Sequence, residues 1–434
     1  MFEHLIKIDN CKCGKSHELS TKKYVVKQGA IKELPAVLDE FKINGKVLCV
    51  FDSNTKKAAG DRINDALPDA DEYVYDVEPG KLLHPLDSEI YPLRDYIVRG
   101  EYALAISVGG GVITDITRYA AYLAGIPLIT VPTCASVDGF VSNTCAIVLN
   151  GMKYSAPSDA PIAVVADIDV IAAAPSFLAA SGVGDMVAKY LAIAEWRIGN
   201  LTSDEYYCDM IANCAIVATN EIVDNIEGIA KREPQAISKL IEGLLLSSIA
   251  MQLATITRPA SSFEHQFSHY LEIIPGTGVD ENALHGEKVG VGTLIGHANY
   301  EAIINAFCSI DENTKNIFST EYAVSKFLDK PDHIKELVAK ENKTSTSMDL
   351  KVPLLKKNCS KVKEIQEKLP TYEKLLSALK TVGAKTTYRD IGLTRDMVHR
   401  VFSECAYIRN RYTTLRNVCD YNVFDFSKLI IPEE

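Results

Sequence analysis

Three histidines and one aspartate have the side-chain types and spacing of a metal site. His265 and His269 lie four residues apart, which would place both imidazoles on one face of a helix. His285 follows 16 residues after His269, so three of the nine histidines fall within 21 residues. Asp185 adds a carboxylate at an expected helix start. Such a ligand set leaves a position open for water or a substrate oxygen and suits Zn²⁺, Ni²⁺ or Fe²⁺.

Each of these residues also has an ordinary structural interpretation. Asp185 and Lys189, four residues apart, could form a surface ion pair. His265 and His269 could be core histidines with hydrogen-bonded nitrogens, and His285 could cap a helix. The clustering of titratable groups favours the metal site over these separate interpretations.

A second group of metal-ligand types stands near the N-terminus and consists of Cys11, Cys13 and His17. No second Cys-x-x-Cys or paired-histidine half follows it, so a structural zinc site is the less favoured interpretation here. The chain holds 11 cysteines, an odd number, at spacings that match no disulfide framework. We expect reduced thiols in a cytoplasmic protein.

A glycine-rich turn, Gly109, Gly110 and Gly111, follows an apolar run and precedes a helical segment that contains Asp115. Glycines permit positive φ and close backbone approach, and a helix N-terminus offers amide groups to a phosphate. This chemistry suits a dinucleotide pyrophosphate. The spacing is not the usual G-x-G-x-x-G, and a tight turn without a ligand is the alternative.

Short polar residues follow two other expected strands. Asp52 could bind the ribose hydroxyls of NAD(H), although it could equally form a turn with Ser and Asn. Thr133, Ser136 and Ser142 could bind nucleotide or sugar hydroxyls, and Asp138 could accept from a substrate hydroxyl. The alternative is a capping cluster, since these residue types also begin helices.

Alternation of apolar runs and helical segments predicts a parallel sheet with right-handed crossovers. The expected strands are Lys46–Phe51, Ala103–Val108, Pro127–Val131 and Ala163–Ala166. Beyond residue 174 the periodicity is helical, and the expected helices include Gly184–Gly199, Tyr206–Asn225, Gln235–Arg258 and Gly286–Phe307. We therefore predict a Rossmann-like α/β dinucleotide-binding domain over 1–174 and an all-α metal- and substrate-binding domain over 175–434. The polar stretch 340–363 is expected to be an exposed loop or insertion.

Composition excludes several functional classes. The 434 residues are 47% hydrophobic and carry a formal net charge of −11, with pI ≈ 5.4. An acidic chain is a poor nucleic-acid binder. No stretch approaches the ~18 uninterrupted apolar residues of a membrane span, and the first residues lack the features of a secretory signal. We expect no nucleic-acid or membrane partner.

Five segments in order resemble one enzyme family: GGGVITDITRYAA, PTCASVDGFVS, GVGDMVAKYLAIAEW, FEHQFSHYLE and HGEKVGVGTL. The chain resembles the sn-glycerol-1-phosphate dehydrogenases, within the iron-type alcohol dehydrogenase, glycerol dehydrogenase and dehydroquinate synthase superfamily. Its nearest resemblance is to the bacterial branch associated with arabinose operons, which also tends to carry an early CxCG segment and a late one like YIRNRYTTL. The resemblance covers about residues 10–415.

This resemblance implies a dehydroquinate synthase-like fold and a metal-dependent oxidoreductase. The implied reaction interconverts dihydroxyacetone phosphate and sn-glycerol 1-phosphate with NAD(H) or NADP(H) and one Zn²⁺ or Ni²⁺. Residues implied to hold the dinucleotide are Gly109, Gly110, Gly111 and Asp115, with Thr133, Ser136 and Ser142. Implied metal ligands are Asp185, His265 and His285. Asp138, Asp185 and His269 are implied to serve substrate binding and catalysis. We expect a homodimer or larger homo-oligomer.

Three features distinguish this sequence from other branches of the superfamily. Lys189 stands where iron-type alcohol dehydrogenases have His, and Asp185 where dehydroquinate synthases have Glu. The His265 and His269 spacing of four differs from the spacing of three typical of glycerol dehydrogenases. A polyol dehydrogenase, a dehydroquinate synthase-like cyclase and a non-catalytic regulator stay open as alternatives.

Overall fold

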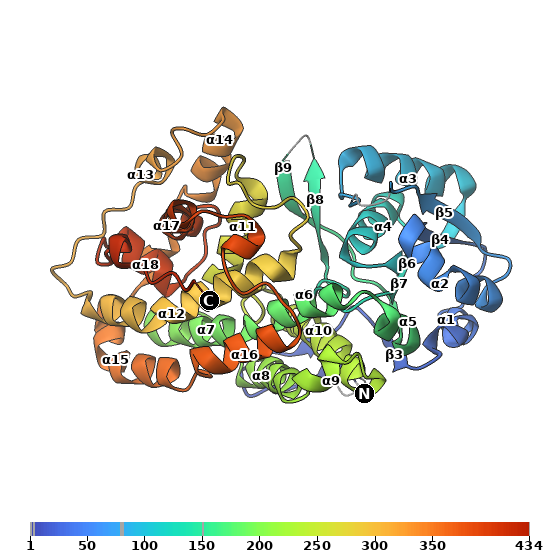
Figure 1. Cartoon of the computed structure of the whole chain (residues 1–434), viewed down its shortest axis with the longest axis horizontal. Helices are drawn as coiled ribbons and strands as arrows, with labels where there is room; N and C mark the ends of the chain where they lie inside the picture. Colours follow the sequence, from blue (N-terminus) through green and yellow to red (C-terminus); the bar gives the residue numbers. More distant parts are fainter. Residues whose placement is uncertain (1, 3–4, 79–81, 150–151, 434) are drawn as a thin grey trace. The chain divides into compact units, whose positions relative to one another are not determined.

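A computed structural model describes residues 2, 5–78, 82–149 and 152–433. The chain forms two compact units (Figure 1). The first comprises Met1–Met186 and Asn220–Ile256, and the second comprises Val187–Thr219 and Thr257–Glu434.

A six-stranded parallel sheet forms the centre of the first unit, which confirms the predicted α/β fold. In spatial order its strands are β3 (Lys23–Lys27), β10 (Ala163–Asp167), β7 (Leu128–Pro132), β6 (Tyr102–Gly109), β4 (Lys46–Asp52) and β5 (Asp71–Tyr75). The four expected strands are present. The two that were not expected are the edges, β3 and β5, in which polar residues at the strand ends leave an apolar run of only three residues.

Helices cover both faces of this sheet because its strands present apolar side chains in both directions. Cys49 and Phe51 of β4 pack with η2 (Ala30–Glu33), α1 (Leu34–Glu40) and α2 (Ser53–Ala66). Leu48 and Val50 of the same strand pack with α3 (Asp87–Gly100) and α4 (Gly111–Ala124). Figure 1 shows these helices around the sheet. The sheet is therefore the middle layer of three.

Two antiparallel hairpins and several helices complete the first unit. The hairpins pair β1 (Lys7–Ile8) with β2 (His17–Glu18), and β8 (Thr144–Leu149) with β9 (Met152–Pro157). The helices are α5 (Ile168–Ala173), most of α6 (Ser176–Val187), α9 (Ile226–Ala230) and α10 (Pro234–Ala254).

Helix α10 explains why residues 220–256 group with the sheet. It contacts α5, β2 and β3, so a segment distant in sequence joins the N-terminal layers. The predicted domain division at residues 174/175 stays a prediction.

The second unit is helical, with no strand among the described residues of 187–219 and 257–433. Around its core lie α7 (Lys189–Ser203), α11 (Phe263–Ile273), α12 (His285–Ser309), α13 (Thr320–Ser325), α14 (Asp332–Glu341), α15 (Val352–Glu367), α16 (Tyr372–Thr381), α17 (Arg395–Glu404) and α18 (Thr414–Asp420). Helix α8 (Asp209–Asp224) begins in this unit and ends in the other.

The expected exposed loop at 340–363 is wrong. The end of α14, a short 3-10 helix (Thr346–Asp349) and most of α15 occupy this stretch. Leu355 and Val362, seven residues apart, are fully buried in the core. A separation of seven residues places both side chains on the same face of a helix, as in an amphipathic helix. The lysines between Leu355 and Val362 make the segment polar in composition, so its buried face is not evident from composition alone.

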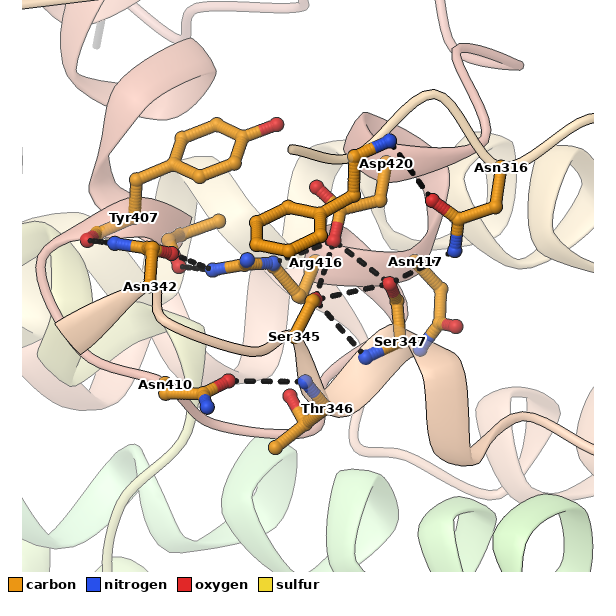
Figure 2. A network of polar contacts seen from close by, with 12 residues as sticks. Asn316, Asn342, Ser345, Thr346, Ser347, Tyr407, Asn410, Arg416, Asn417 and Asp420 are labelled. Carbon is orange, nitrogen blue, oxygen red and sulfur yellow. Dashed lines mark hydrogen bonds and ion pairs between the residues drawn. The ribbon is translucent and has the colours of Figure 1, made fainter. Parts of the chain in front are cut away.

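A buried ion pair holds the last helix of the second unit in place. Nε of Arg416 lies 2.7 Å from Oδ2 of Asp420, and both side chains are fully buried. Ser347 Oγ also donates to Asp420, and Arg416 donates to Oδ1 of Asn342 and the carbonyl of Ala406 (Figure 2). These bonds compensate for removing two charges from water and connect α18 with the segment after α14.

Two segments are long and apolar enough to cross a membrane by length and composition, Ser176–Ser203 and Pro234–Ala254. In their most apolar windows 83% and 72% of the residues are buried within the structure. Such burial is typical of core helices, so the two segments are weak evidence for membrane insertion.

Candidate functional site

The glycine turn connects β6 to α4, as the sequence predicts. Gly110 is the residue before the helix, and no side chain caps the helix amides there. None of the three glycines has positive φ, so conformational freedom is not why they are needed. A Cβ at Gly109 would lie 2.6 Å from Cβ of Ile113, and one at Gly111 would lie 2.9 Å from Val137. The glycines allow close packing around the N-terminus of α4, whose uncapped amides are of the kind that bind anions.

Asp115 takes part in a structural network. Its carboxylate accepts hydrogen bonds of 3.2 Å from NH1 of Arg118 and from the amide of Ala146 in β8. Arg118 is buried and also donates to the carbonyls of Gly139 and Phe140. The network fixes α4 against the following hairpin, and a contact between Asp115 and a dinucleotide stays a prediction.

Asp52 is the N-cap of α2. Its Oδ1 accepts hydrogen bonds of 2.8 Å from the amides of Asn54 and Thr55, and Thr55 Oγ1 accepts from the amide of Asp52. Asp52 therefore begins a helix and does not form a turn, since Ser53 and Asn54 already belong to α2. Its predicted contact with a ribose is not tested by these bonds, both of which fall on Oδ1.

The predicted hydroxyl residues lie in the segment that follows β7. The amide of Thr133 donates to the carbonyl of Gly109 over 3.2 Å, which places this segment beside the glycine turn. Ser136 Oγ lies 3.4 Å from Sγ of Cys134, and Ser142 Oγ accepts from the amide of Thr144. Two predicted nucleotide-binding segments thus meet at the carboxyl ends of β6 and β7, where ligands bind in open α/β sheets.

Asp138 and Asp185, 47 residues apart, are neighbours within the first unit. The amide of Asp138 donates to Oδ2 of Asp185 over 3.0 Å, and Asp185 is fully buried. Ser247 Oγ of α10 donates to Oδ2 of Asp138 over 2.7 Å, and Ser248 Oγ donates to the Asp138 carbonyl. Burial rules out a surface ion pair for Asp185.

A glycine allows α6 to bring Asp185 this close. A Cβ at Gly182 would lie 2.0 Å from the carbonyl oxygen of Ala135, so any larger residue would push α6 away. Ser181 Oγ strengthens the same contact by donating to the carbonyl of Ser136 over 3.0 Å. Gly182 is thus a positioning residue that sequence reasoning did not single out.

The three predicted histidines gather within the second unit. His265 and His269 lie on α11, and His285 is the first residue of α12. The ring centroids are 5.6 Å apart for His265 and His285, 5.6 Å for His269 and His285, and 6.2 Å for His265 and His269. The spacing of four along α11 and the helix start of α12 together converge three imidazoles.

Two carboxylates orient two of these imidazoles, those of His265 and His285. Nδ1 of His265 lies 2.9 Å from Oε1 of the fully buried Glu264, and Nδ1 of His285 lies 3.0 Å from Oε1 of Glu272. A carboxylate accepts the Nδ1 proton, so each ring presents the Nε2 lone pair. This is the outer-shell arrangement of metal-binding histidines. Sequence reasoning missed both glutamates, although an acid beside a ligand histidine is the available signal.

The buried carboxylate of Glu264 makes its hydrogen bonds through one oxygen. Its Oε1 accepts from the amide of Ser262 over 2.7 Å, whereas Oε2 is buried without a hydrogen-bond partner in the described part of the chain. A buried negative charge is costly without a positive charge nearby, and Arg411 lies close enough to Glu264 to interact with it electrostatically. The imidazoles of His265 and His285, each with a carboxylate at Nδ1, are the donors that fit a divalent metal.

Two cations that could bind a substrate phosphate already have acidic partners. Lys288 Nζ lies 2.9 Å from Oε1 of Glu272. Arg258 Nε lies 2.8 Å from Oε1 of Glu205, and its NH2 donates to the carbonyl of Glu195. The pairing shows that they also compensate partly buried acids.

Comparison with known proteins points to one enzyme group. The model of the iron-containing alcohol dehydrogenase family matches residues 25–175. A protein of Geobacillus thermodenitrificans named glycerol-1-phosphate dehydrogenase (NAD(P)+) is 31% identical over 93% of this chain and 94% of its own length. A protein of the same name from Pyrococcus horikoshii is 34% identical over 62% of this chain and 76% of its own.

Solved structures share the fold. A sulfoacetaldehyde reductase from Bifidobacterium kashiwanohense, solved in complex with NAD+, has a TM-score of 0.64 at 15% identity and covers 95% of this chain and 98% of its own. A probable glycerol dehydrogenase from Sinorhizobium meliloti has a TM-score of 0.61 at 20% identity and covers 94% and 98%. At these identities the likeness establishes architecture alone.

Proposed function

Because this chain belongs to the glycerol-1-phosphate dehydrogenase family, we propose that it interconverts dihydroxyacetone phosphate and sn-glycerol 1-phosphate with NAD(H) or NADP(H). The observation that carries the proposal is the histidine cluster, in which Glu264 and Glu272 hold the Nδ1 atoms of His265 and His285. Carboxylates that hold the Nδ1 atoms of converging histidines form the outer shell of many metal sites, and this supports a metal-dependent oxidoreductase.

The proposed metal ligands are Asp185, His265 and His285, and Zn²⁺ or Ni²⁺ is the proposed ion. The carboxylate and imidazole donors suit either metal. When bound, the metal supplies Lewis-acid polarisation of a substrate carbonyl and stabilises negative charge on its oxygen. Glu264 and Glu272 act through the histidines by keeping Nε2 unprotonated.

Asp138 and His269 are the proposed substrate residues. Asp138 would accept a hydrogen bond from a substrate hydroxyl, and Ser247 holds the carboxylate that does so. Fixing that hydroxyl orients C2 for hydride transfer, and orientation of this kind lowers the barrier. His269 would carry the proton that the substrate oxygen exchanges, since an imidazole titrates near neutral pH.

The first unit is the proposed dinucleotide-binding part. The uncapped amides of α4 at Gly110 and Gly111 would receive the pyrophosphate. Thr133, Ser136 and Ser142 would bind hydroxyls, and Asp52 would accept from the ribose through Oδ2. Since the N-cap bonds use Oδ1, capping and ribose binding are compatible.

The remaining proposals concern the setting of the protein. We propose a cytoplasmic homodimer or larger homo-oligomer that acts on a small phosphorylated triose or polyol, without a nucleic-acid or membrane partner. The acidic net charge of −11 supports the exclusion of nucleic acid.

The test is oxidation of NADH or NADPH by chelated protein reloaded with Zn²⁺ or Ni²⁺, with dihydroxyacetone phosphate or unphosphorylated dihydroxyacetone as substrate. We expect metal-dependent turnover that requires the phosphate. Equal turnover without the phosphate would assign a polyol dehydrogenase instead. Absence of reduced-cofactor consumption with either metal would overturn the oxidoreductase proposal and favour a cyclase or a regulator.

A further inference from the structure

Cys11, Cys13 and His17 lie close together in the β1–β2 hairpin of the first unit. A turn brings the cysteines back toward β2: the amide of Gly14 donates to the carbonyl of Cys11 over 2.9 Å. Gly14 has φ +84°, a left-handed conformation that a side chain would strain. The potential ligand atoms of the two cysteines and the histidine all lie within 4.8 Å of one another. Three soft or borderline donors therefore point to one place.

A backbone carbonyl orients the His17 ring through Nδ1, as is common for metal-binding histidines. His17 is buried, and its Nδ1 lies 2.7 Å from the carbonyl oxygen of Leu253 in α10. A carbonyl only accepts, so Nδ1 carries the proton and Nε2 presents its lone pair. Nε2 lies 3.2 Å from Sγ of Cys13. Sulfur and nitrogen ligands of one tetrahedral zinc lie about 3.5 Å apart, from bond lengths of about 2.3 and 2.0 Å.

We propose that Cys11, Cys13 and His17 bind a Zn²⁺ ion with a structural role. On binding, the two thiols release their protons to solvent, and the two thiolates balance the charge of the ion. Water or another side chain of the chain supplies the fourth ligand. The spacing Cys-x-Cys is one residue shorter than the commonest zinc pattern, and His17 arrives through the hairpin instead of through a second sequence motif. This site is independent of the proposed dehydrogenase activity.

The zinc would fasten the N-terminal hairpin to α10. Gln252, next to Leu253, accepts from the amide of Ser20 and donates to the carbonyl of Val141. One and a half turns earlier, Ser247 holds Asp138. The end of α10 thus joins the hairpin to the segment that follows β7. We expect zinc loss to increase hydrogen exchange in residues 5–22 first.

The experiment counts zinc in full-length protein after dialysis against metal-free buffer under reducing conditions. Compared proteins are wild type, the double variant C11S/C13S, the proposed catalytic-metal variant D185N, and the triple combination. We expect two, one, one and no equivalents. The control C214S replaces another half-buried cysteine and should match wild type. A double variant that keeps the wild-type zinc content would overturn the site, whether or not the protein proves to be a dehydrogenase.

Cobalt substitution provides a second readout should the double variant fail to fold. In D185N protein the only cobalt expected is at the hairpin, and it should show a thiolate-to-cobalt charge-transfer band whose intensity reports the number of sulfur ligands. Three thiolates would identify the fourth ligand as a cysteine, which serine substitution of the other nine would locate. A cobalt spectrum without this band would mean that Cys13 and His17 share only a thiol–imidazole hydrogen bond, and would overturn the proposal.

Discussion

The backbone amide of Asp138 donates a 3.0 Å hydrogen bond to Oδ2 of Asp185. The backbone of Asp138, the proposed substrate-orienting residue, therefore helps to fix the side chain of Asp185, the proposed metal ligand. Any change that moves the segment after β7 moves the carboxylate environment of Asp185 as well. This coupling gives several variants a definite expected result.

Ser247→Ala should impair catalysis through Asp138. It removes the hydroxyl that donates to Oδ2 and leaves a buried carboxylate oxygen without that partner. Without this bond the carboxylate can leave the position that orients the substrate hydroxyl, so kcat/KM should fall by about 10-fold. Steady-state kinetics with dihydroxyacetone phosphate measure this.

The matched control for that variant is Ser238→Ala on the same helix, whose hydroxyl bonds Glu242 instead. It should leave kcat/KM within about twofold of wild type. Equal losses in the two variants would mean that Ser247 acts through helix stability alone.

Asp185→Asn should abolish turnover while NADH binding persists. The amide that replaces the carboxylate still accepts from the Asp138 amide but is a much weaker metal ligand, because it has no negative charge. Activity assays, metal content and NADH fluorescence titration measure the three consequences. Full activity in this variant would remove Asp185 from the metal site.

Glu264→Gln should weaken metal binding without removing a ligand. The amide oxygen of Gln can still accept from Nδ1 of His265, but the loss of charge makes the imidazole a poorer donor to the metal. Loss of an outer-shell partner costs about 10–100-fold in metal affinity. Competition with a chelator measures that affinity.

Glu341→Gln offers a matched control for Glu264→Gln, because Glu341 pairs with Arg409 and contacts none of the three histidines in the bonds described. It should retain wild-type metal affinity. If Glu264→Gln does the same, the carboxylate is structural.

Stability should fall as pH drops because of His297. Burial lowers the pKa of this imidazole below its usual value, while Nε2 donates to the carbonyl of Pro370 over 2.7 Å. Since the unfolded chain then binds a proton more readily than the folded chain, stability is full above the unfolded pKa of about 6.5 and is lost as pH falls through the lower folded pKa. Urea unfolding between about pH 7.5 and 5 measures the slope.

His297→Gln should flatten that slope, because the Gln amide can keep the bond to Pro370 without titrating. His333→Gln, at an exposed histidine, should leave the slope unchanged. An identical pH dependence in His297→Gln and wild type would assign the effect to other groups.

Much of the architecture follows from local sequence. The apolar runs of β4, β6, β7 and β10 identify central strands because strands buried on both faces tolerate few polar residues. The glycine turn after β6 and the placement of His265 and His269 on one helix can likewise be predicted, since both depend on neighbours within a few residues. The edge strands and α15 are harder to predict, because polar residues on their exposed faces leave few consecutive apolar residues.

The long-range contacts of these residues could not be predicted from the sequence. No local pattern indicates that Ser247 reaches Asp138, that Gly182 admits the carbonyl of Ala135, or that Leu253 accepts from His17. These contacts join residues 47 to 236 positions apart in the sequence. Residue types and helical or strand periodicity determined which groups this protein has and on which elements they stand. The packing of α6 and α10 determined which of them meet, because a buried polar atom must find its partner wherever the folded chain places one.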